Sequence, residues 1–247
     1  MLTEERHQYI IEQLNQHQTV SVQDLVTNLG HSESTIRRDL TTLEDQDLLV
    51  RVHGGAKKKR EPVDEPTMDE KTVKFIHEKE KISQLAASLI NDFDVIYLDA
   101  GTTTYSMIPH LKDKNITIVT NGVPHAVLLT DYNIETILLG GRIKQRTKAI
   151  IGAIAEQTLA EVNFTKAFMG MNGVDVSQGF TTPDIDEAAI KRKAISQSNQ
   201  SYVLVDLSKL EEVHFKKVAD IDECTIITNT LPDKYHHFKE YTRIMEA

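Results

Sequence analysis

Two adjacent arginines, Arg37 and Arg38, carry the first chemistry that the sequence suggests. They lie in a segment that Ser32 opens, and serine favours the start of a helix because its hydroxyl accepts a bond from an early backbone N–H. At about 100° per residue such a helix has two faces, an apolar one of Ile36, Leu40 and Leu43 and a polar one of Ser34, Arg37, Arg38 and Thr41. Guanidinium groups pair with guanine or phosphate, and hydroxyls reach either. The segment is a candidate DNA-reading helix, although the same pattern also describes a solvated helix with two surface arginines.

A second set of polar residues recurs after the apolar, strand-like runs of the remaining chain. The run Asp99-Ala100-Gly101-Thr102-Thr103-Thr104 follows the first of these strands and leads into a helix. Glycine lets a ligand approach the backbone, hydroxyls donate hydrogen bonds, and a helix N-terminus favours an anion. Similar residues follow later runs, namely Asn121, Gly141, Arg142, Gly173, Asp175 and Lys209, and a predicted helix adds Glu187, Lys191 and Arg192. Together they supply the donors, acceptors and cations that a phosphorylated polyol requires.

The elements that must position the arginines are short helices with a turn between them. Residues 3–16 carry an apolar stripe of Ile10, Ile11 and Leu14. Ser21 opens a second helix whose apolar residues Val22, Leu25, Val26 and Leu29 have the spacing of a buried stripe, and Gly30 ends it. The β-prone residues 48–52 and the Gly54-Gly55 pair predict a hairpin after the third helix. We therefore expect a winged helix-turn-helix domain over residues 1–56.

The rest of the chain predicts an α/β domain over residues 70–247. Short apolar runs at 95–98, 116–119, 136–139, 167–169, 202–205 and 225–228 alternate with helical segments in most places. This pattern favours a largely parallel sheet that helices cover on both faces, with the ligand site beyond the carboxyl ends of the strands. Residues 57–69 are charged and contain two prolines, and we expect them to form a linker.

The N-terminal segment resembles the DNA-binding half of the DeoR family of bacterial repressors. The resemblance rests on Glu5-Arg6 and Ile10, on Val22-Gln23-Asp24-Leu25, on Ser34-Thr35-Ile36-Arg37-Arg38-Asp39-Leu40 and on Arg51-Val52-His53-Gly54-Gly55-Ala56. It implies a repressor that binds operator DNA as a homodimer or homotetramer. The DNA-binding residues that we expect are Ser32, Ser34, Thr35, Arg37 and Arg38, with Arg51 and His53 in the wing.

The second half is similar to the effector domain of the same family, whose fold is Rossmann-like and close to ribose-5-phosphate isomerase. The matching runs include Leu98 to Thr104, Leu139-Gly140-Gly141, Phe168-Met169-Gly170 and Asp206-Leu207-Ser208-Lys209. The resemblance implies binding of a phosphorylated sugar by Asp99, Gly101, Thr102, Thr103, Asp175, Glu187 and Lys209, and Thr104, Asn121, Gly141, Arg142, Gly173 and Lys191 complete the candidate set. Ile151-Gly152 and the run from Gly179 to Asp184 look most like repressors of fructose operons. Fructose 1-phosphate and fructose 1,6-bisphosphate are therefore candidate effectors.

Composition bounds the remaining classes. The net charge of −9 is unusual for a DNA-binding protein, but residues 31–60 hold 7 basic and 5 acidic side chains, and local charge governs phosphate attraction. The single Cys224 and the lack of a long apolar run predict a cytoplasmic protein with no membrane partner, and the scattered histidines suggest no metal site and no cofactor.

Two alternatives remain open at this stage. A sugar-phosphate isomerase with a fused DNA-binding arm would use Asp175 or Glu187 with Lys209 to move a proton between C1 and C2. Against it, a free-standing catalyst has no use for a winged helix. A DeoR-type regulator of another sugar or polyol pathway is the second alternative.

Overall fold

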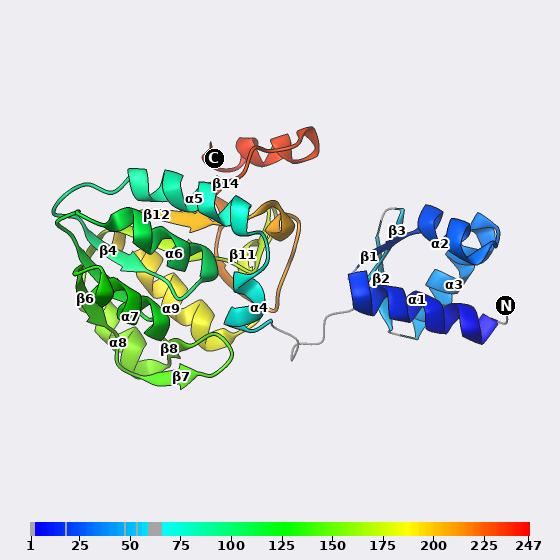
Figure 1. The fold of residues 1–247 in the computed structure, drawn as a ribbon, viewed down its shortest axis with the longest axis horizontal. Helices are drawn as coiled ribbons and strands as arrows, with labels where there is room; N and C mark the ends of the chain where they lie inside the picture. The colour runs from blue at the N-terminus through cyan, green and yellow to red at the C-terminus, as the bar shows by residue number, and fades with distance from the viewer. Residues whose placement is uncertain (1–2, 18, 47, 53, 59–65) are drawn as a thin grey trace. The chain divides into compact units, whose positions relative to one another are not determined.

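The N-terminal part of the protein folds as three helices and a small antiparallel sheet (Figure 1). The computed structural model describes residues 3–17, 19–46, 48–52, 54–58 and 66–247, and the chain divides into two compact units, Met1–Asp64 and Glu65–Ala247. The first unit contains α1 (Thr3–His17), β1 (Thr19–Ser21), α2 (Val22–Leu29), α3 (Glu33–Asp45), β2 (Leu49–Val52) and β3 (Gly55–Lys58). The strands pair antiparallel in the order β1-β3-β2. The expected winged arrangement is confirmed. Strand β1 was not predicted, because a strand of three residues is too short to show an alternating pattern.

Local sequence explains where these helices begin and end. The hydroxyl of Ser21 accepts a bond from Asp24 N at 3.0 Å, and Ser32 Oγ accepts one from Thr35 N at 3.3 Å. Gly30 ends α2 in the left-handed conformation, with φ of 65°, where a side chain would be strained. The core of the unit consists of Ile10, Leu14, Val22, Leu25, Ile36, Leu40, Leu43, Leu49 and Ala56.

The second unit is built on a parallel sheet. Its strands are β4 (Val95–Leu98), β5 (Thr117–Thr120), β6 (Glu135–Leu138), β9 (Phe164–Gly170), β12 (Ser198–Leu204), β14 (Thr225–Thr228) and β15 (Ile244–Glu246). Within residues 66–247 they lie in the order β15-β14-β12-β9-β4-β5-β6, with every adjacent pair parallel. The predicted α/β class and parallel sheet are thus confirmed.

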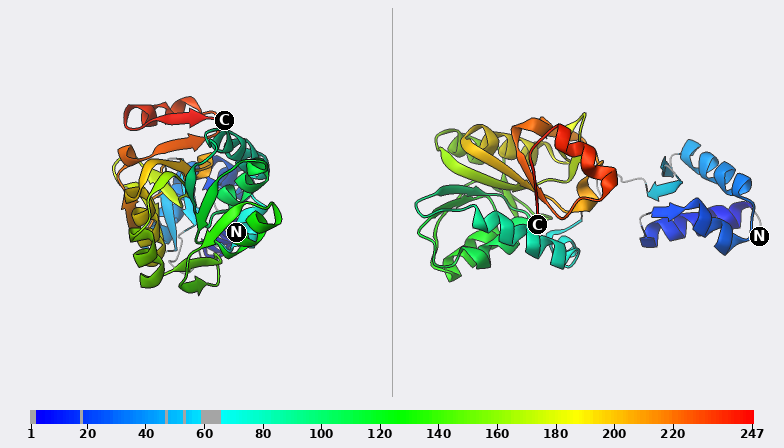
Figure 2. Two further views of the ribbon diagram at one scale, coloured as in Figure 1. Left: turned by 90° about the vertical axis from the view of Figure 1, so that its left-hand side faces the viewer. Right: turned by 90° about the horizontal axis from the view of Figure 1, so that it is seen from above.

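Helices cover both faces of this sheet (Figure 2). Alternate residues of β4 point to opposite faces, so Ile96 and Leu98 belong to one core and Tyr97 to the other. The first core also receives side chains from α5 (Ile76–Ser88), α6 (Thr102–Met107) and α7 (Val123–Asp131). The second core receives side chains from α8 (Ala153–Ala160) and α9 (Ile185–Ser196).

Smaller elements complete the unit. A short helix, α4 (Met68–Thr72), precedes α5 in the chain. Strands β7 (Arg142–Lys144) and β8 (Ala149–Ile151) form a hairpin, and β10 (Gly173–Asp175), β11 (Gly179–Thr182) and β13 (Lys216–Ala219) form a small antiparallel sheet. No helix among the described residues is both long and apolar enough to cross a membrane.

The strand order creates one switch point, between β4 and β9. From β4 the chain moves outward to β5 and β6, and it then returns to β9 on the other side of β4 and continues to β12, β14 and β15. Loops that leave the carboxyl ends of β4 and β9 therefore diverge and leave a crevice, where ligands bind in open α/β sheets.

Candidate functional site

Helix α3 has the two faces that the sequence predicts. Ile36, Leu40 and Leu43 are at most 1% exposed, whereas Ser34, Arg37 and Arg38 lie at the surface. Arg37 is held by Glu33 one turn earlier, with Nε and Nη2 at 2.8 and 2.6 Å from Oε1. The helix thus presents two guanidinium groups and a hydroxyl on one exposed face, which suits contact with DNA bases and phosphates.

The other expected DNA-binding residues lie around this face. Ser32 Oγ caps α3 and lies 3.0 Å from Ser34 Oγ and 2.9 Å from Thr35 Oγ1, so its hydroxyl has a structural use already. Arg51 joins the wing to α3 because its Nη1 donates to Thr41 Oγ1 at 2.9 Å and its backbone N donates to Glu44 Oε1 at 2.9 Å. The prediction for His53 falls outside the described residues.

A buried ion pair behind α3 was not anticipated. Asp39 accepts two bonds from Arg6 of α1, from Nε at 2.8 Å and Nη2 at 2.9 Å, and its Oδ1 lies 3.1 Å from His7 Nε2. Burial raises the pKa of Asp39, but the bonds from Arg6 and His7 outweigh burial and leave this pKa below its ordinary value. The carboxylate therefore stays charged and fixes α3 to α1. The sequence did hold one sign that Asp39 is buried, because it lies beside Ile36 and Leu40 on the apolar face of the helix.

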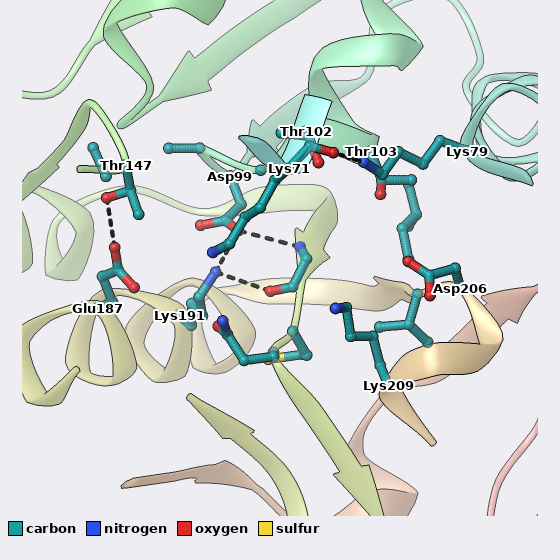
Figure 3. Close-up of a pocket in the computed structure, with 18 of the residues that line it drawn as sticks. Lys71, Lys79, Asp99, Thr102, Thr103, Thr147, Glu187, Lys191, Asp206 and Lys209 are labelled. Atoms are coloured by element: carbon teal, nitrogen blue, oxygen red, sulfur yellow. Dashed lines mark hydrogen bonds and ion pairs between the residues drawn. The ribbon is translucent and has the colours of Figure 1, made fainter. Parts of the chain in front are cut away.

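At the switch point between β4 and β9 the second unit contains a partly open cavity (Figure 3). The charged groups that line it, counted over the described residues, are Lys71, Lys74, Lys79, Lys191 and Lys209 against Asp99, Glu187 and Asp206. Thr102, Thr103, Asn121 and Thr147 add hydroxyl and amide groups. The lining therefore carries a net positive charge together with groups that hydrogen-bond to hydroxyls.

The floor of the cavity is an ion pair between Asp99 and Lys191. Asp99 follows β4, Lys191 comes from α9, and their side chains point toward one another (Figure 3). Lys191 Nζ also donates to Gly170 O at 2.9 Å, while Gly170 N donates to Asp99 Oδ2 at 3.2 Å. Because both side chains are less than a tenth exposed, this network ties β4, β9 and α9 together directly beneath any bound ligand.

A second carboxylate, Glu187, lies one turn earlier on α9. Its Oε1 accepts a bond from Thr147 Oγ1 at 2.8 Å and lies 3.2 Å from Lys144 Nζ. These contacts join α9 to the turn between β7 and β8. Glu187 and Asp99 are both acceptors that a sugar hydroxyl could use.

The lysines on the other side of the cavity come from the segment before the sheet and from the loop after β12. Lys79 of α5 is 5% exposed, and burial lowers its pKa to about 8, with Lys209 and Lys71 adding to the effect against Asp206. Figure 3 shows Lys79 beside Thr103 at the start of α6, with Asp206 and Lys209 facing it. A desolvated ammonium beside a glycine-threonine turn is well suited to an anion such as phosphate.

The Gly101 turn is supported from behind by His125. Its Nε2 lies 3.0 Å from Gly101 O and 3.2 Å from Thr104 Oγ1, and Thr104 Oγ1 in turn donates to Asp99 O at 2.6 Å. Burial lowers the pKa of His125 to about 4, so the ring is neutral near neutral pH. Thr104 therefore braces the turn and does not line the cavity.

His125 predicts a loss of stability in acid. Because its pKa falls from 6.5 unfolded to about 4 folded, the folded state prefers the neutral ring, and stability declines as the pH falls from 6.5 toward 4. We expect a loss of about 2–3 kcal/mol between pH 7.5 and pH 4.5 from this group. Hydrogen exchange of the β4 and β5 amides measures it. A His125→Gln variant should lose most of this pH dependence, and an unchanged slope in the variant would contradict the assignment.

The remaining predicted residues lie elsewhere. Gly141 packs against the hairpin β7–β8, and Arg142 is exposed and pairs with Asp186 at 2.6 Å. Gly173 begins β10, where an added Cβ would lie 2.2 Å from Glu212 O. Asp175 Oδ1 accepts bonds from Ser177 N and Gln178 N at 2.8 and 2.9 Å in a tight turn. None of these four residues lines the cavity.

Sequence reasoning missed several lining residues, chiefly Lys71, Lys74, Lys79 and Thr147, and it named the run that contains Asp206 without placing Asp206 in the site. The three lysines precede the first strand, so the rule that ligands meet the carboxyl ends of strands did not point to them. Thr147 lies in a hairpin turn that the sequence did not predict. Among the described residues no group of three or more His, Cys, Asp or Glu side chains could hold a metal ion.

Comparison with known families and proteins accounts for nearly the whole chain. Residues 6–61 match the DeoR-like helix-turn-helix domain, and residues 74–230 match the DeoR C terminal sensor domain. The uncharacterized HTH-type transcriptional regulator FruR of Bacillus subtilis is 49% identical over 98% of this chain and 97% of its own length. The transcriptional repressor GlcR of the same organism is 35% identical over 95% of this chain and 91% of its own, and the lactose phosphotransferase system repressor of Streptococcus mutans is 32% identical over 99% and 100%.

Solved structures give a more distant likeness. Ribose 5-phosphate isomerase A of Methanocaldococcus jannaschii is 21% identical with a TM-score of 0.41 and covers 53% of each chain. The eIF2B delta subunit of Chaetomium thermophilum is 16% identical with a TM-score of 0.46, and the match covers 63% of this chain and 56% of that one.

Proposed function

The chain belongs to the DeoR family of helix-turn-helix transcriptional regulators, with a DNA-binding unit and a sensor unit, and is no enzyme. From this premise we propose that it represses a sugar catabolic operon, that for fructose uptake and phosphorylation, and that a phosphorylated sugar in the sensor cavity releases it from the operator. The observation that carries the proposal is the lysine cluster beside the Gly101 turn at the β4–β9 switch point.

The cavity offers different chemistry for the two ends of such a ligand. Lys79 with Thr102 and Thr103 would bind the phosphate group through charge-assisted hydrogen bonds. Asp99 and Glu187, held in place by their own partners, would accept bonds from sugar hydroxyls. A free sugar lacks the phosphate, so it would leave the cationic part of the cavity unneutralised and bind much more weakly.

The choice of fructose is supported by the FruR relative, which shares 49% of its residues with this chain along nearly the full length. The names of GlcR and of the lactose phosphotransferase system repressor connect other relatives with other sugars. Fructose 1-phosphate and fructose 1,6-bisphosphate are therefore the first effectors to test. Self-association into a dimer or tetramer would let two copies of α3 bind two operator half-sites.

The test is operator binding in the presence of sugar phosphates. The full-length protein is titrated onto fluorescent DNA from upstream of its own gene at fixed salt, with fructose 1-phosphate, fructose 1,6-bisphosphate, glucose 6-phosphate and free fructose added separately. Release by one of the two fructose phosphates alone supports the proposal. Release by a different sugar phosphate would assign the repressor to the pathway of that sugar. Specific operator binding that no sugar phosphate weakens would overturn the proposal that a sugar phosphate is the effector.

Arg37→Ala is expected to raise the operator Kd by about 10- to 100-fold, because one guanidinium contact to a base or phosphate is lost. Its affinity for the sugar phosphate should match that of the wild type, since the sensor unit is unchanged. Fluorescence anisotropy and calorimetry measure the two affinities. Arg243→Ala, an exposed arginine of the sensor unit, is the matched control and should bind the operator normally. Loss of both affinities in the folded Arg37 variant would contradict the division of roles.

A further inference from the structure

Helix α4 is held at its start by the wall of the sensor cavity. Its first residue, Met68, is 9% exposed, and its backbone N donates to Arg146 O at 3.0 Å. Arg146 precedes Thr147, whose hydroxyl donates to Glu187 inside the cavity. A capping box between Thr67 and Glu70 completes this end, with Thr67 N donating to Glu70 Oε2 at 2.7 Å.

The other end of α4 is held by a lysine of the cavity. Lys79 Nζ donates to the backbone carbonyl of Lys71, in the last turn of the helix. The same carbonyl also accepts a backbone bond from Lys74 N at 3.3 Å, so the ammonium adds to this end of the helix, where a cation is stabilising. Since Lys79 is only 5% exposed, this hydrogen bond is largely shielded from water. Both ends of α4 are therefore fixed by groups that line, or directly adjoin, the ligand site.

A phosphate group would compete for Lys79. The Lys79 ammonium lines the cavity beside Thr103, and a doubly charged phosphate attracts an ammonium more strongly than a neutral carbonyl does. Burial outweighs the attraction of Asp206 and lowers the pKa of Lys79, so a further negative charge beside this ammonium would stabilise its charged form. Movement of Lys79 toward the phosphate would take the cation away from α4.

We propose that α4 is the coupling element of this regulator, and that a ligand phosphate group loosens it by drawing Lys79 away from the Lys71 carbonyl. The proposal rests on the proposed function, because it requires a phosphate group in this cavity. In chain order α4 is the first helix of the sensor unit, after the residues that follow β3. A change in α4 is therefore a change at the point where the sensor unit begins.

Lys79→Met separates this role from simple ligand binding. If Lys79 holds α4, the variant should behave like the liganded protein, with an operator Kd raised without any ligand by the full effector response, about 5- to 150-fold. If Lys79 only binds the ligand, the variant should bind the operator like the wild type and merely fail to respond to fructose 1-phosphate, which would overturn the proposal. Lys81→Met, an exposed lysine on the same helix, should behave as the wild type.

Hydrogen exchange on the wild-type protein gives a second readout that needs no variant. Inorganic phosphate, compared with sodium chloride at equal ionic strength, should speed exchange of the amides of residues 68–74 by about tenfold, because one charge-assisted bond is lost. Amides of α5 beyond Lys79 should not change. Protection of residues 68–74 that stays equal or rises would overturn the proposal. If no sugar phosphate weakens operator binding by the wild-type protein, the proposed function and this inference both fail. If a sugar phosphate does weaken it, but Lys79→Met binds the operator with wild-type affinity, only the coupling role of α4 fails.

Discussion

Lys191→Met is expected to abolish the response to the sugar phosphate and to destabilise the sensor unit by about 3–5 kcal/mol, because removal of one partner leaves a buried charge uncompensated. Asp99 would keep only the weak bond from Gly170 N at 3.2 Å, beneath the ligand site. Calorimetry with the sugar phosphate and hydrogen exchange of the sheet measure the two effects. A variant that binds the ligand with wild-type affinity would show that the pair is no part of the site.

A second buried ion pair, at the opposite end of β4, provides a matched control. Lys166 of β9 pairs with Asp94 at 2.5 Å, next to the amino end of β4, and both side chains are 10% exposed. Lys166→Met should therefore cost similar stability while ligand affinity remains normal, since neither residue lines the cavity. Asp99→Asn combined with Lys191→Met should recover most of the stability, because no charge is left unpaired, yet it should not recover ligand binding.

Asp39→Asn is expected to impair DNA binding strongly, although Asp39 is buried behind α3 and is not one of the expected DNA-binding residues. The variant loses the charge that Arg6 pairs with, and Arg6 is itself 7% exposed, so a buried guanidinium is left with a neutral partner. We expect a loss of about 3 kcal/mol, which is a large share of the stability of a domain of about sixty residues. Operator binding should then fail at 37 °C, while sugar-phosphate binding by the sensor unit should persist.

The exposed pair on the same helix gives the contrast. Glu33→Gln breaks the Glu33–Arg37 contact, whose side chains are 60% and 49% exposed, and should cost less than about 1 kcal/mol. Arg6→Met with Asp39→Leu should restore much of the stability, because an apolar pair can replace a buried ion pair. Hydrogen exchange of the α1 and α3 amides measures these differences. Equal costs for Asp39→Asn and Glu33→Gln would contradict the role of the buried pair.

Periodicity was sufficient to predict the three helices of the DNA-binding unit. The faces of α3 follow from residue spacing alone, and Ser21, Gly30 and Ser32 mark helix ends through their own backbone and hydroxyl chemistry. The contact between Asp39 and Arg6 could not be read in the same way, because the two residues are 33 positions apart and their charges suggest solvent exposure.

The site of the sensor unit was predicted in part, and the strand order explains which part. Asp99 and Gly101 follow β4, which flanks the switch point, so they line the cavity. Arg142 follows β6, which is the edge strand, so the sheet places it away from the cavity. The order of strands depends on tertiary packing, which the pattern of a single strand does not encode. The lysines of α4 and α5 were missed because they precede β4, where the rule about the carboxyl ends of strands does not apply.

Reciprocal binding tests the central claim most directly, namely that one ligand in the cavity weakens DNA binding. The affinity of the full-length protein for fructose 1-phosphate is measured by calorimetry, once alone and once saturated with operator DNA. Linkage requires that the operator weaken sugar-phosphate binding by the same factor by which the sugar phosphate weakens operator binding. Equal factors well above one are the expected result. Identical sugar-phosphate affinities with and without operator would contradict the claim.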